Sequence, residues 1–371
     1  AAVRALGRRG LAAGPGGRAY LAEDCSPGTY NRSQYLALNL LGKTLRFTTD
    51  ISDLGCGCIA AFYLTSMRQN PNRSECMDYY CDANNVCGES CAEIDVQEAN
   101  MHAWHSTLHS RADHSGLGMG YGGGGDGWSG PRNWAAAEYG PGARCIDTSR
   151  PFQVAASFPV DANGSLMAMT VKLSQPGSGC PLSLTLDNYP GMGELSSALR
   201  AGMTPIVSYW RSAEMLWLDG RGADSKGPCG RDAPRDCADR ASFYDFSLQC
   251  IKGREGGGCR LAQPRPRSNR THATRTEKRL RTKQAGADGR AWWDIEEALA
   301  GASRALAADG HGKAARVGSE LLAALAAAAG FIAVLTKIHG GRGLGSCLPA
   351  RGQHSSEQLL TSGGAPPASP R

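Results

Sequence analysis

The chain has 371 residues, 41% of them hydrophobic and 20% charged, which allows a sizeable core in one large all-β domain with appendages or in two domains. The formal net charge is +6, but eight Lys or Arg and one Glu lie between Arg265 and Lys283, so the rest of the chain is nearly neutral. No Phe, Tyr or Trp lies among these basic residues, so we do not expect a nucleic-acid-binding protein.

Fourteen cysteines are too many for an ordinary cytosolic enzyme, and five lie between Cys76 and Cys145. Disulfide bonds in an oxidising compartment are the simplest explanation. Four Asn-X-Ser/Thr glycosylation sequons also favour a secreted, extracellular glycoprotein: they begin at Asn31, Asn72, Asn163 and Asn269. Ala1–Arg18 contains no apolar signal-peptide core and no initiator Met, so we expect that the true start of the protein is missing from this chain.

Alternating apolar residues in the first part of the chain predict a β-sheet. The predicted strands are Tyr35–Leu41, Leu45–Ile51 and Ile59–Leu64, with turns at Gly42-Lys43 and Asp53–Gly55. Met67–Glu93 is polar and rich in cysteine, which predicts a loop stiffened by disulfides.

The next segment, Cys91–Asn100, carries three carboxylates within six residues: Glu93, Asp95 and Glu98. Ile94 and Val96 alternate with the first two, which predicts a strand with one face in the core and the other in a cleft. A regular strand would turn Glu98 to the opposite face. A bulge near Gln97 would bring it back, and bulges are common beside active sites.

Three carboxylates on one face repel one another, so at least one should keep its proton near neutral pH and could act as a general acid. Retaining glycoside hydrolysis uses such a set, with a nucleophilic carboxylate and a protonated carboxyl ~5–5.5 Å apart. The spacing alone is equally consistent with an ordinary, solvated acidic strand edge.

After this strand, His102, His105 and His109 follow at spacings of three and four, which would place them on one face of a helix. A metal site is therefore considered, but the Glu of an H-E-x-x-H motif is absent and no metal is expected. One His beside the carboxylates is the favoured interpretation. The glycine-dense segment Gly116–Gly127 predicts a flexible loop and not a phosphate-binding turn.

Four further strands are predicted, at Phe152–Phe158, Leu166–Leu173, Ile206–Trp210 and Met215–Leu218. Many short strands separated by loops favour a β-sandwich. Trp210 and Trp217 lie near strand ends. Burial in the core is the default for any Trp, and a stacking platform for sugar rings is the functional alternative.

The composition changes after Leu248. Residues 251–286 are rich in Gly, Pro and Arg and are expected to form a basic linker. Apolar residues then recur at helical spacing, so a small helical segment of unknown role is expected over 287–340, before a disordered tail over 341–371. The uncharged apolar run Leu321–Leu335 is too short for a bilayer, which needs ~20 residues, so a membrane span is not expected.

Several blocks of residues, in order, point to a known family. They are Arg18-Ala-Tyr-Leu, Cys56-Gly-Cys-Ile-Ala-Ala-Phe-Tyr-Leu-Thr-Ser-Met, Tyr80-Cys-Asp, Glu93-Ile-Asp-Val-Gln-Glu-Ala-Asn, Tyr139-Gly-Pro-Gly with Ile146-Asp-Thr, and Met215-Leu-Trp-Leu-Asp. From about Arg18 to Leu248 the chain resembles the family 7 glycoside hydrolases, the cellobiohydrolases and endoglucanases that cut β-1,4-glucan. The carboxylate pattern alone also fits family 16 β-glucanases, but the Tyr-Gly-Pro-Gly and Met-Leu-Trp-Leu-Asp blocks decide for family 7.

The resemblance implies a concanavalin A-like jelly-roll sandwich over residues 18–250, with N-terminal strands missing, and a long glucan-binding cleft. It implies that Glu93 is the nucleophile, Glu98 the acid/base and Asp95 the residue that orients Glu93 and tunes its proton affinity. The implied substrate-binding residues are Tyr80, Asp82, Asn84, His109, Trp128, Arg132, Trp210, Trp217 and Lys226. The implied disulfides are Cys56–Cys229 and Cys81–Cys91.

The chain departs from the family pattern at several places. Asn84 replaces a usual Gln, and Lys226 replaces an Arg, which keeps the charge but loses the planar fork. The segments Met67–Glu93 and His109–Arg132 are short, which would open the cleft. We therefore expect a retaining endo-β-1,4-glucanase that needs no cofactor and acts as a monomer. The alternatives are a cellobiohydrolase and a non-catalytic or truncated glucan-binding protein.

Overall fold

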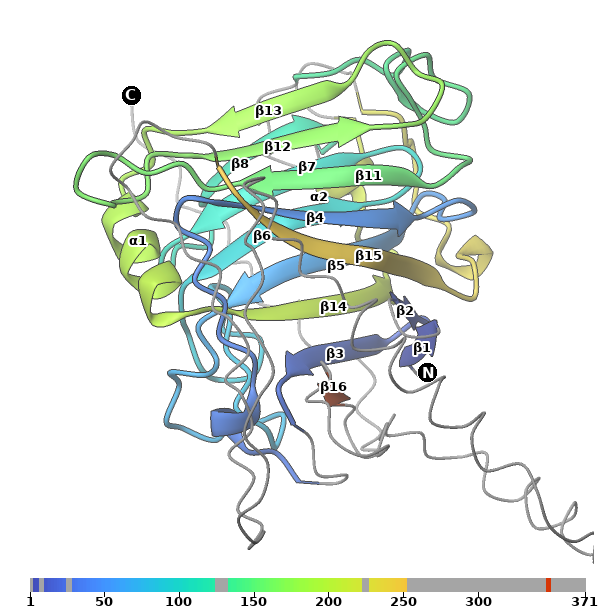
Figure 1. Cartoon of the computed structure of the whole chain (residues 1–371). Coiled ribbons are helices and arrows are strands. Elements are labelled where there is room, and N and C mark those ends of the chain that lie inside the picture. Colours follow the sequence, from blue (N-terminus) through green and yellow to red (C-terminus); the bar gives the residue numbers. More distant parts are fainter. Residues whose placement is uncertain are drawn as a thin grey trace, which may run out of the picture.

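The computed structural model describes residues 3–6, 10–24, 29–123, 133–221 and 227–251, together with the backbone of 345–347. Two seven-stranded antiparallel sheets are stacked on each other (Figure 1). The first, here called the β4 sheet, has the order β1 (Val3–Leu6), β2 (Gly10–Ala13), β15 (Ala241–Cys250), β4 (Lys43–Asp50), β11 (Phe152–Ser157), β12 (Met169–Ser174) and β13 (Leu182–Leu186).

The second, here called the β6 sheet, has the order β16 (Gly345–Cys347), β3 (Gly17–Ala22), β14 (Thr204–Arg211), β5 (Cys58–Thr65), β6 (Glu93–Ala99), β7 (Trp104–His109) and β8 (Leu117–Tyr121). Short elements complete the described fold: strands β9 (Tyr139–Gly140) and β10 (Ile146–Asp147), helices α1 (Met192–Ala201) and α2 (Leu216–Asp219), and 3₁₀ turns η1 (Arg32–Gln34) and η2 (Pro234–Asp236). This architecture confirms the predicted all-β jelly-roll sandwich.

The core lies between the two sheets because each strand turns every second side chain inward. Phe47 of β4 and Phe62 of β5 meet there with ring centroids 4.6 Å apart, and Phe243 of β15 packs beside both. Burying a side chain of this size is worth roughly 1.5–3 kcal/mol. The apolar contact between the sheets therefore fixes which side of each strand faces away from the core.

Disulfides join parts of this sandwich that are distant in the sequence and also close short loops. Five are present among the described residues: Cys56–Cys229, Cys58–Cys237, Cys76–Cys87, Cys81–Cys91 and Cys145–Cys180. The set includes both pairings that the family resemblance implies. Cys56–Cys229 closes 173 residues of chain, and long closed loops restrict the unfolded chain most in the chain-entropy account of disulfide stabilisation.

Three predicted elements are wrong. Tyr35–Leu41 forms no regular strand and makes isolated bridges at Tyr35 and Leu38. Met215–Leu218 was predicted as a strand, but Leu216–Asp219 is helix α2, because Met215 and Leu218 are buried together at helical spacing. The glycine-dense segment was predicted as a loop, but strand β8 begins in it, since Leu117, Met119 and Tyr121 alternate with glycine and pack on the core.

The chain ends also differ from expectation. Strands β1 and β2 precede the predicted domain start at Arg18 and extend the β4 sheet. Gly345–Cys347 pairs with β3 inside the tail that was predicted to be disordered. The helical segment predicted over 287–340, and the linker beyond Ile251, lie outside the described residues. Within the described ranges, no helix is long and apolar enough to span a membrane.

Candidate active site

The side of the β6 sheet that faces away from the β4 sheet, here called the outer face, carries the predicted carboxylates. Strand register and pleat arrange its side chains in rows that cross neighbouring strands. The row of Glu93 is Thr204, Thr65, Glu93 and His109; the row of Asp95 is Ile206, Tyr63, Asp95 and Thr107; the row of Glu98 is Ser208, Ala61, Glu98 and His105. The three carboxylates therefore lie along β6 at the centre of this face.

A bulge in β6 makes this arrangement possible. Tyr63 is paired with Asp95 and the preceding Phe62 with Gln97, so Val96 has no partner of its own on β5. Gln97 turns inward, where its amide donates to the hydroxyl of Thr49 on β4 at 3.1 Å. The extra residue restores Glu98 to the outer face, as the sequence predicted.

Glu93 is buried, with 6% of its surface exposed. The backbone N–H of Ala83 donates to its carboxylate at 2.9 Å. The disulfide Cys81–Cys91 holds this contact, because Cys81 lies two residues before Ala83 and Cys91 lies two residues before Glu93. Burial raises the pKa of Glu93 well above its usual range, and the charges of Asp95 and Asp82 raise it further, while the Ala83 hydrogen bond opposes the rise.

Asp95 lies 3.3 Å from the ring Nε2 of His109, which is also buried. The other ring nitrogen, Nδ1, lies 2.6 Å from the carbonyl oxygen of Asp113. Burial lowers the pKa of His109, but the hydrogen bonds and charge of Asp95, with the Asp113 carbonyl, outweigh burial and raise it to about 9. With both nitrogens donating to oxygens, His109 is an imidazolium at neutral pH.

Glu98 is partly exposed and faces His105 across the β6–β7 pair. Burial and the charge of Asp95 raise its pKa well above the usual range, against the opposing charge of His109. Among the described residues, Glu98 receives no hydrogen bond comparable to the one that Ala83 gives Glu93. The Ala83 N–H favours the ionised form of Glu93, and this donor has no counterpart at Glu98 among the described residues.

The segment Tyr80–Asn84 lies against one side of this centre. The hydroxyls of Tyr80 and Tyr63 are 3.1 Å apart, and the guanidinium carbon of Arg18 lies 3.7 Å from the centre of the Tyr80 ring. Asp82 is buried, and burial raises its pKa. Asn84 is exposed, and its side-chain oxygen lies 3.1 Å from Nδ1 of His114. The sequence analysis did not assign Arg18 or Tyr63 to the site, although both residues lie in the blocks that resemble family 7.

Trp210 and Trp217 lie together, with ring centroids 6.5 Å apart and planes inclined at 24°. Both are partly buried on a small apolar cluster that includes Ile59 and Leu218. Trp210 is in β14, and Trp217 is in α2, where the sequence predicted a strand. The remaining predicted substrate-binding residues lie outside the described ranges: Trp128, Arg132 and Lys226.

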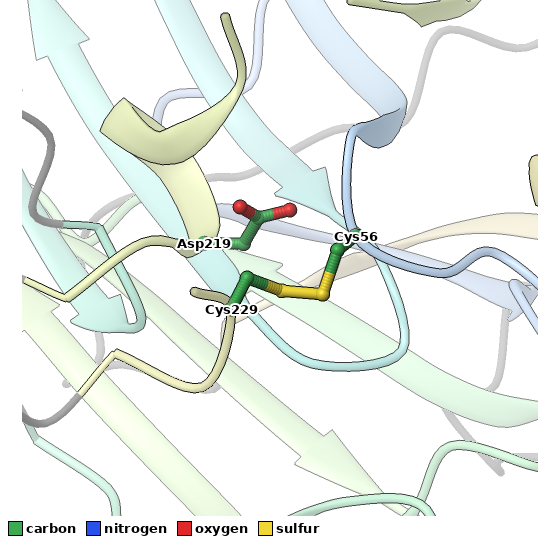
Figure 2. Close-up of side chains that lie close together, drawn as sticks. All are labelled: Cys56, Asp219 and Cys229. Atoms are coloured by element: carbon green, nitrogen blue, oxygen red, sulfur yellow. A yellow bond between two sulfur atoms is a disulfide. The ribbon is translucent and has the colours of Figure 1, made fainter. Parts of the chain in front are cut away.

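The histidines do not form the helical face considered from the sequence. His105 and His109 are on strand β7, where even spacing puts both on the outer face, and His102 precedes the strand. Among the described residues, one group of three possible metal-binding side chains lies within 4.8 Å: Cys56, Asp219 and Cys229. Its two sulfurs form a disulfide, so neither is a thiolate ligand (Figure 2).

The curated proteins to which this chain is similar are fungal endoglucanases. No family model matches the chain. It is 29% identical over 279 residues to endo-beta-1,4-glucanase celB of Emericella nidulans, covering 57% of this chain and 63% of that protein. It is 27% identical over 268 residues to endoglucanase 1 of Pyricularia oryzae, covering 57% and 62%. The chain thus spans just under two thirds of the length of these curated relatives.

Among solved structures, an endoglucanase I complexed with cellobiose matches with a TM-score of 0.49 and 19% identity, over 65% of this chain and 76% of that one. A GH7 family cellobiohydrolase from Daphnia pulex matches with a TM-score of 0.45 and 20% identity, over 59% and 73%. The curated relatives confirm the resemblance that the sequence motifs predicted: the chain resembles the family 7 glycoside hydrolases.

Proposed function

We propose that this protein is a secreted, retaining endo-β-1,4-glucanase acting on cellulose or a related β-glucan. One observation carries the proposal: Glu93, Asp95 and Glu98 share the outer face of the β6 sheet, brought into line by the bulge. The similarity to curated endo-β-1,4-glucanases supports the reaction class and the endo mode. The disulfides support an oxidising, extracellular compartment, and we propose that the protein acts as a monomer.

In the first step, the carboxylate of Glu93 attacks the anomeric carbon while Glu98 gives its proton to the leaving glycosidic oxygen. The bond to the leaving sugar breaks, and a covalent glycosyl-enzyme forms through Glu93. The Ala83 N–H keeps Glu93 aimed and favours its charged form. Asp95, held by His109, supplies the charge that keeps the proton on Glu98.

In the second step, Glu98 acts as a base and takes a proton from the water that attacks the anomeric carbon. Glu93 leaves, and two displacements at one carbon return the β-configuration. In this proposal, Tyr80, Asp82 and Asn84 contact the sugars near the cleavage point. Trp210 and Trp217 stack on sugar rings of the bound glucan that lie farther from the cleavage point.

The test uses Glu93→Gln and Glu98→Gln, with Glu23→Gln as an exposed control of the same chemistry. Glu93→Gln should abolish activity because no glycosyl-enzyme can form. Glu98→Gln should still be glycosylated by an activated aryl cellobioside, which needs little protonation, and azide should restore turnover as a β-glycosyl azide. Glu23→Gln should match the wild type. Azide rescue of the Glu93 variant with retained configuration, or none for the Glu98 variant, would reverse these roles.

Product analysis separates the proposal from its alternatives. Proton NMR of the first products should show the β-anomer, and soluble cellulose should lose viscosity faster than it releases reducing ends. Cellobiose alone, without a fall in viscosity, would indicate a cellobiohydrolase. Binding to cellulose with no released sugar would indicate a glucan-binding protein.

A further inference from the structure

The loop that follows β7 forms a cradle for the ring of His109. This loop, Ser110–Gly116, is here called the His109 loop. The Asp113 carbonyl oxygen accepts the hydrogen bond from Nδ1 of His109 at 2.6 Å. Gly116 lies against the ring with a positive φ of 51°, and a Cβ there would be 2.4 Å from Nδ1. The loop thus fixes the plane and position of the ring.

The side chain of Asp113 holds the His109 loop in this shape. One carboxylate oxygen accepts from the N–H and hydroxyl of Ser115, at 3.2 and 2.7 Å, and from the N–H of Gly116 at 3.0 Å. The other accepts a short hydrogen bond from the hydroxyl of Tyr189, which lies just before α1. The Tyr189 oxygen in turn accepts from the Ser110 N–H at 2.7 Å.

We propose that Tyr189 and Asp113 are positioning residues that hold the His109 imidazolium against Asp95 and thereby set the proton balance of the catalytic carboxylates. This inference rests on the proposed function. The contacts form a continuous chain from the segment before α1, through the His109 loop, to β6. None of the sequence motifs contained Tyr189 or Asp113.

The charges that face His109 explain why its position matters. From β6 it faces Asp95 directly, Glu93 as its cross-strand partner, and the charge of Glu98. From the His109 loop, the ring faces the carbonyl oxygen of Asp113. It also faces Gly116, the residue just before β8, which has no charge. A ring that turns away also moves its positive charge away from Glu98, and the pKa of Glu98 then rises because the charge of His109 no longer opposes that of Asp95.

Hydrogen bonds also keep the Asp113 anchor ionised. The bond from Tyr189 is the main cause that lowers the pKa of Asp113 to about 2. Removing the Tyr189 hydroxyl takes away one donor to Asp113 and the acceptor for Ser110, while the buried ring stays in place. Tyr189→Phe is therefore the smallest change that loosens the loop without touching His109.

The experiment follows His109 by NMR in ¹⁵N-histidine-labelled protein, titrated from pH 5 to 10 without substrate. Tyr189→Phe should lower the titration midpoint of His109 by about half to one pH unit, the size expected for losing part of one hydrogen bond. Asp113→Asn, which keeps an acceptor for Ser115 and Gly116, should shift it less than Asp113→Ala. Tyr244→Phe, on the opposite sheet, should leave it unchanged.

The pH profile of kcat/KM supplies the second readout. In the Tyr189 variant its acidic and basic limits should shift, whereas a merely structural role would lower the amplitude without moving them. A folded Tyr189→Phe protein with the wild-type His109 midpoint would overturn the inference. Because the NMR titration needs no turnover, a shifted midpoint in a protein without glucanase activity would refute the proposed function and leave the positioning role standing.

Discussion

Asp219 gives the sharpest prediction about stability. Its side chain is 0% exposed at the end of α2, beside the disulfide Cys56–Cys229 (Figure 2). One carboxylate oxygen accepts from the N–H of Gly57 at 3.1 Å and from the amide of Asn100 at 2.7 Å. The other oxygen has no hydrogen-bond partner among the described residues. Burial raises the pKa of Asp219 from 3.8 to about 6, against these two donors.

The unfolding free energy falls as the pH rises, because the folded state binds the Asp219 proton more tightly than the unfolded chain does. Between pH 3.8 and about 6, the folded state keeps the Asp219 proton and the unfolded chain has lost it. The stabilisation is therefore complete below pH 3.8 and is lost as the pH rises through about 6. Two pH units at about 1.4 kcal/mol each give a loss of about 3 kcal/mol from this group.

Asp219→Asn removes the titration and keeps an oxygen for Gly57 and Asn100. We expect the unfolding free energy of the wild type, relative to this variant, to fall by about 2.4 kcal/mol between pH 4 and pH 7, since pH 4 already lies just above the pKa of the unfolded chain. The absolute difference also contains the cost of the unpaired amide group, about 1–3 kcal/mol, which does not depend on pH. Effects of Glu93 and Glu98 are common to both proteins and cancel.

The measurement is urea unfolding with the disulfides intact, followed by Trp fluorescence at several pH values. Asp187→Asn removes an exposed carboxylate and is the matched control, expected to follow the wild-type pH dependence. Parallel curves for the wild type and Asp219→Asn from pH 4 to 7 would refute the reasoning. They would mean that Asp219 binds its proton equally in the folded and unfolded states.

Two further predictions concern the site. Gly116→Ala should cost more unfolding free energy than Gly177→Ala: both glycines have positive φ, which costs about 1–2 kcal/mol for alanine, but only at Gly116 would the new Cβ meet the His109 ring. Equal losses in urea unfolding would contradict the close contact. Trp217→Ala should raise KM for soluble cellulose about tenfold with little change in kcat, because lost ring stacking of ~1.4 kcal/mol weakens ground and transition states alike. An unchanged KM would exclude Trp217 as a platform.

The strands that could be predicted from the sequence are those with a clear apolar pattern. Leu45–Ile51 corresponds to β4, where apolar residues alternate with polar ones, and Ile59–Leu64 corresponds to β5, a continuous apolar run that is buried on both faces. The alternation in β8 was present in Leu117, Met119 and Tyr121, but the intervening glycines dominated the composition. Helix α2 was missed since a four-residue apolar run fits a strand and a helix equally well.

The disulfides show a different limit. Cysteine count and clustering indicated that such bonds exist, and the family resemblance supplied two pairings. Cys58–Cys237, Cys76–Cys87 and Cys145–Cys180 were not predicted, because spacing along the chain does not determine which cysteines meet. Cys56 and Cys58 are only two residues apart at the start of β5, yet they bond to different partners.

The carboxylates could be named from the sequence, but their proton affinities could not. The spacing of Glu93 and Glu98 required a bulge, and the pairing of β5 with β6 supplies it at Val96. What separates the two glutamates chemically comes from other segments: the Ala83 N–H reaches Glu93 from the disulfide-bonded loop, and the His109 charge reaches β6 through β7. These groups lie outside the motif, so the pattern of carboxylates predicts a reaction type, while the segments packed on it shift the pKa values of the carboxyls.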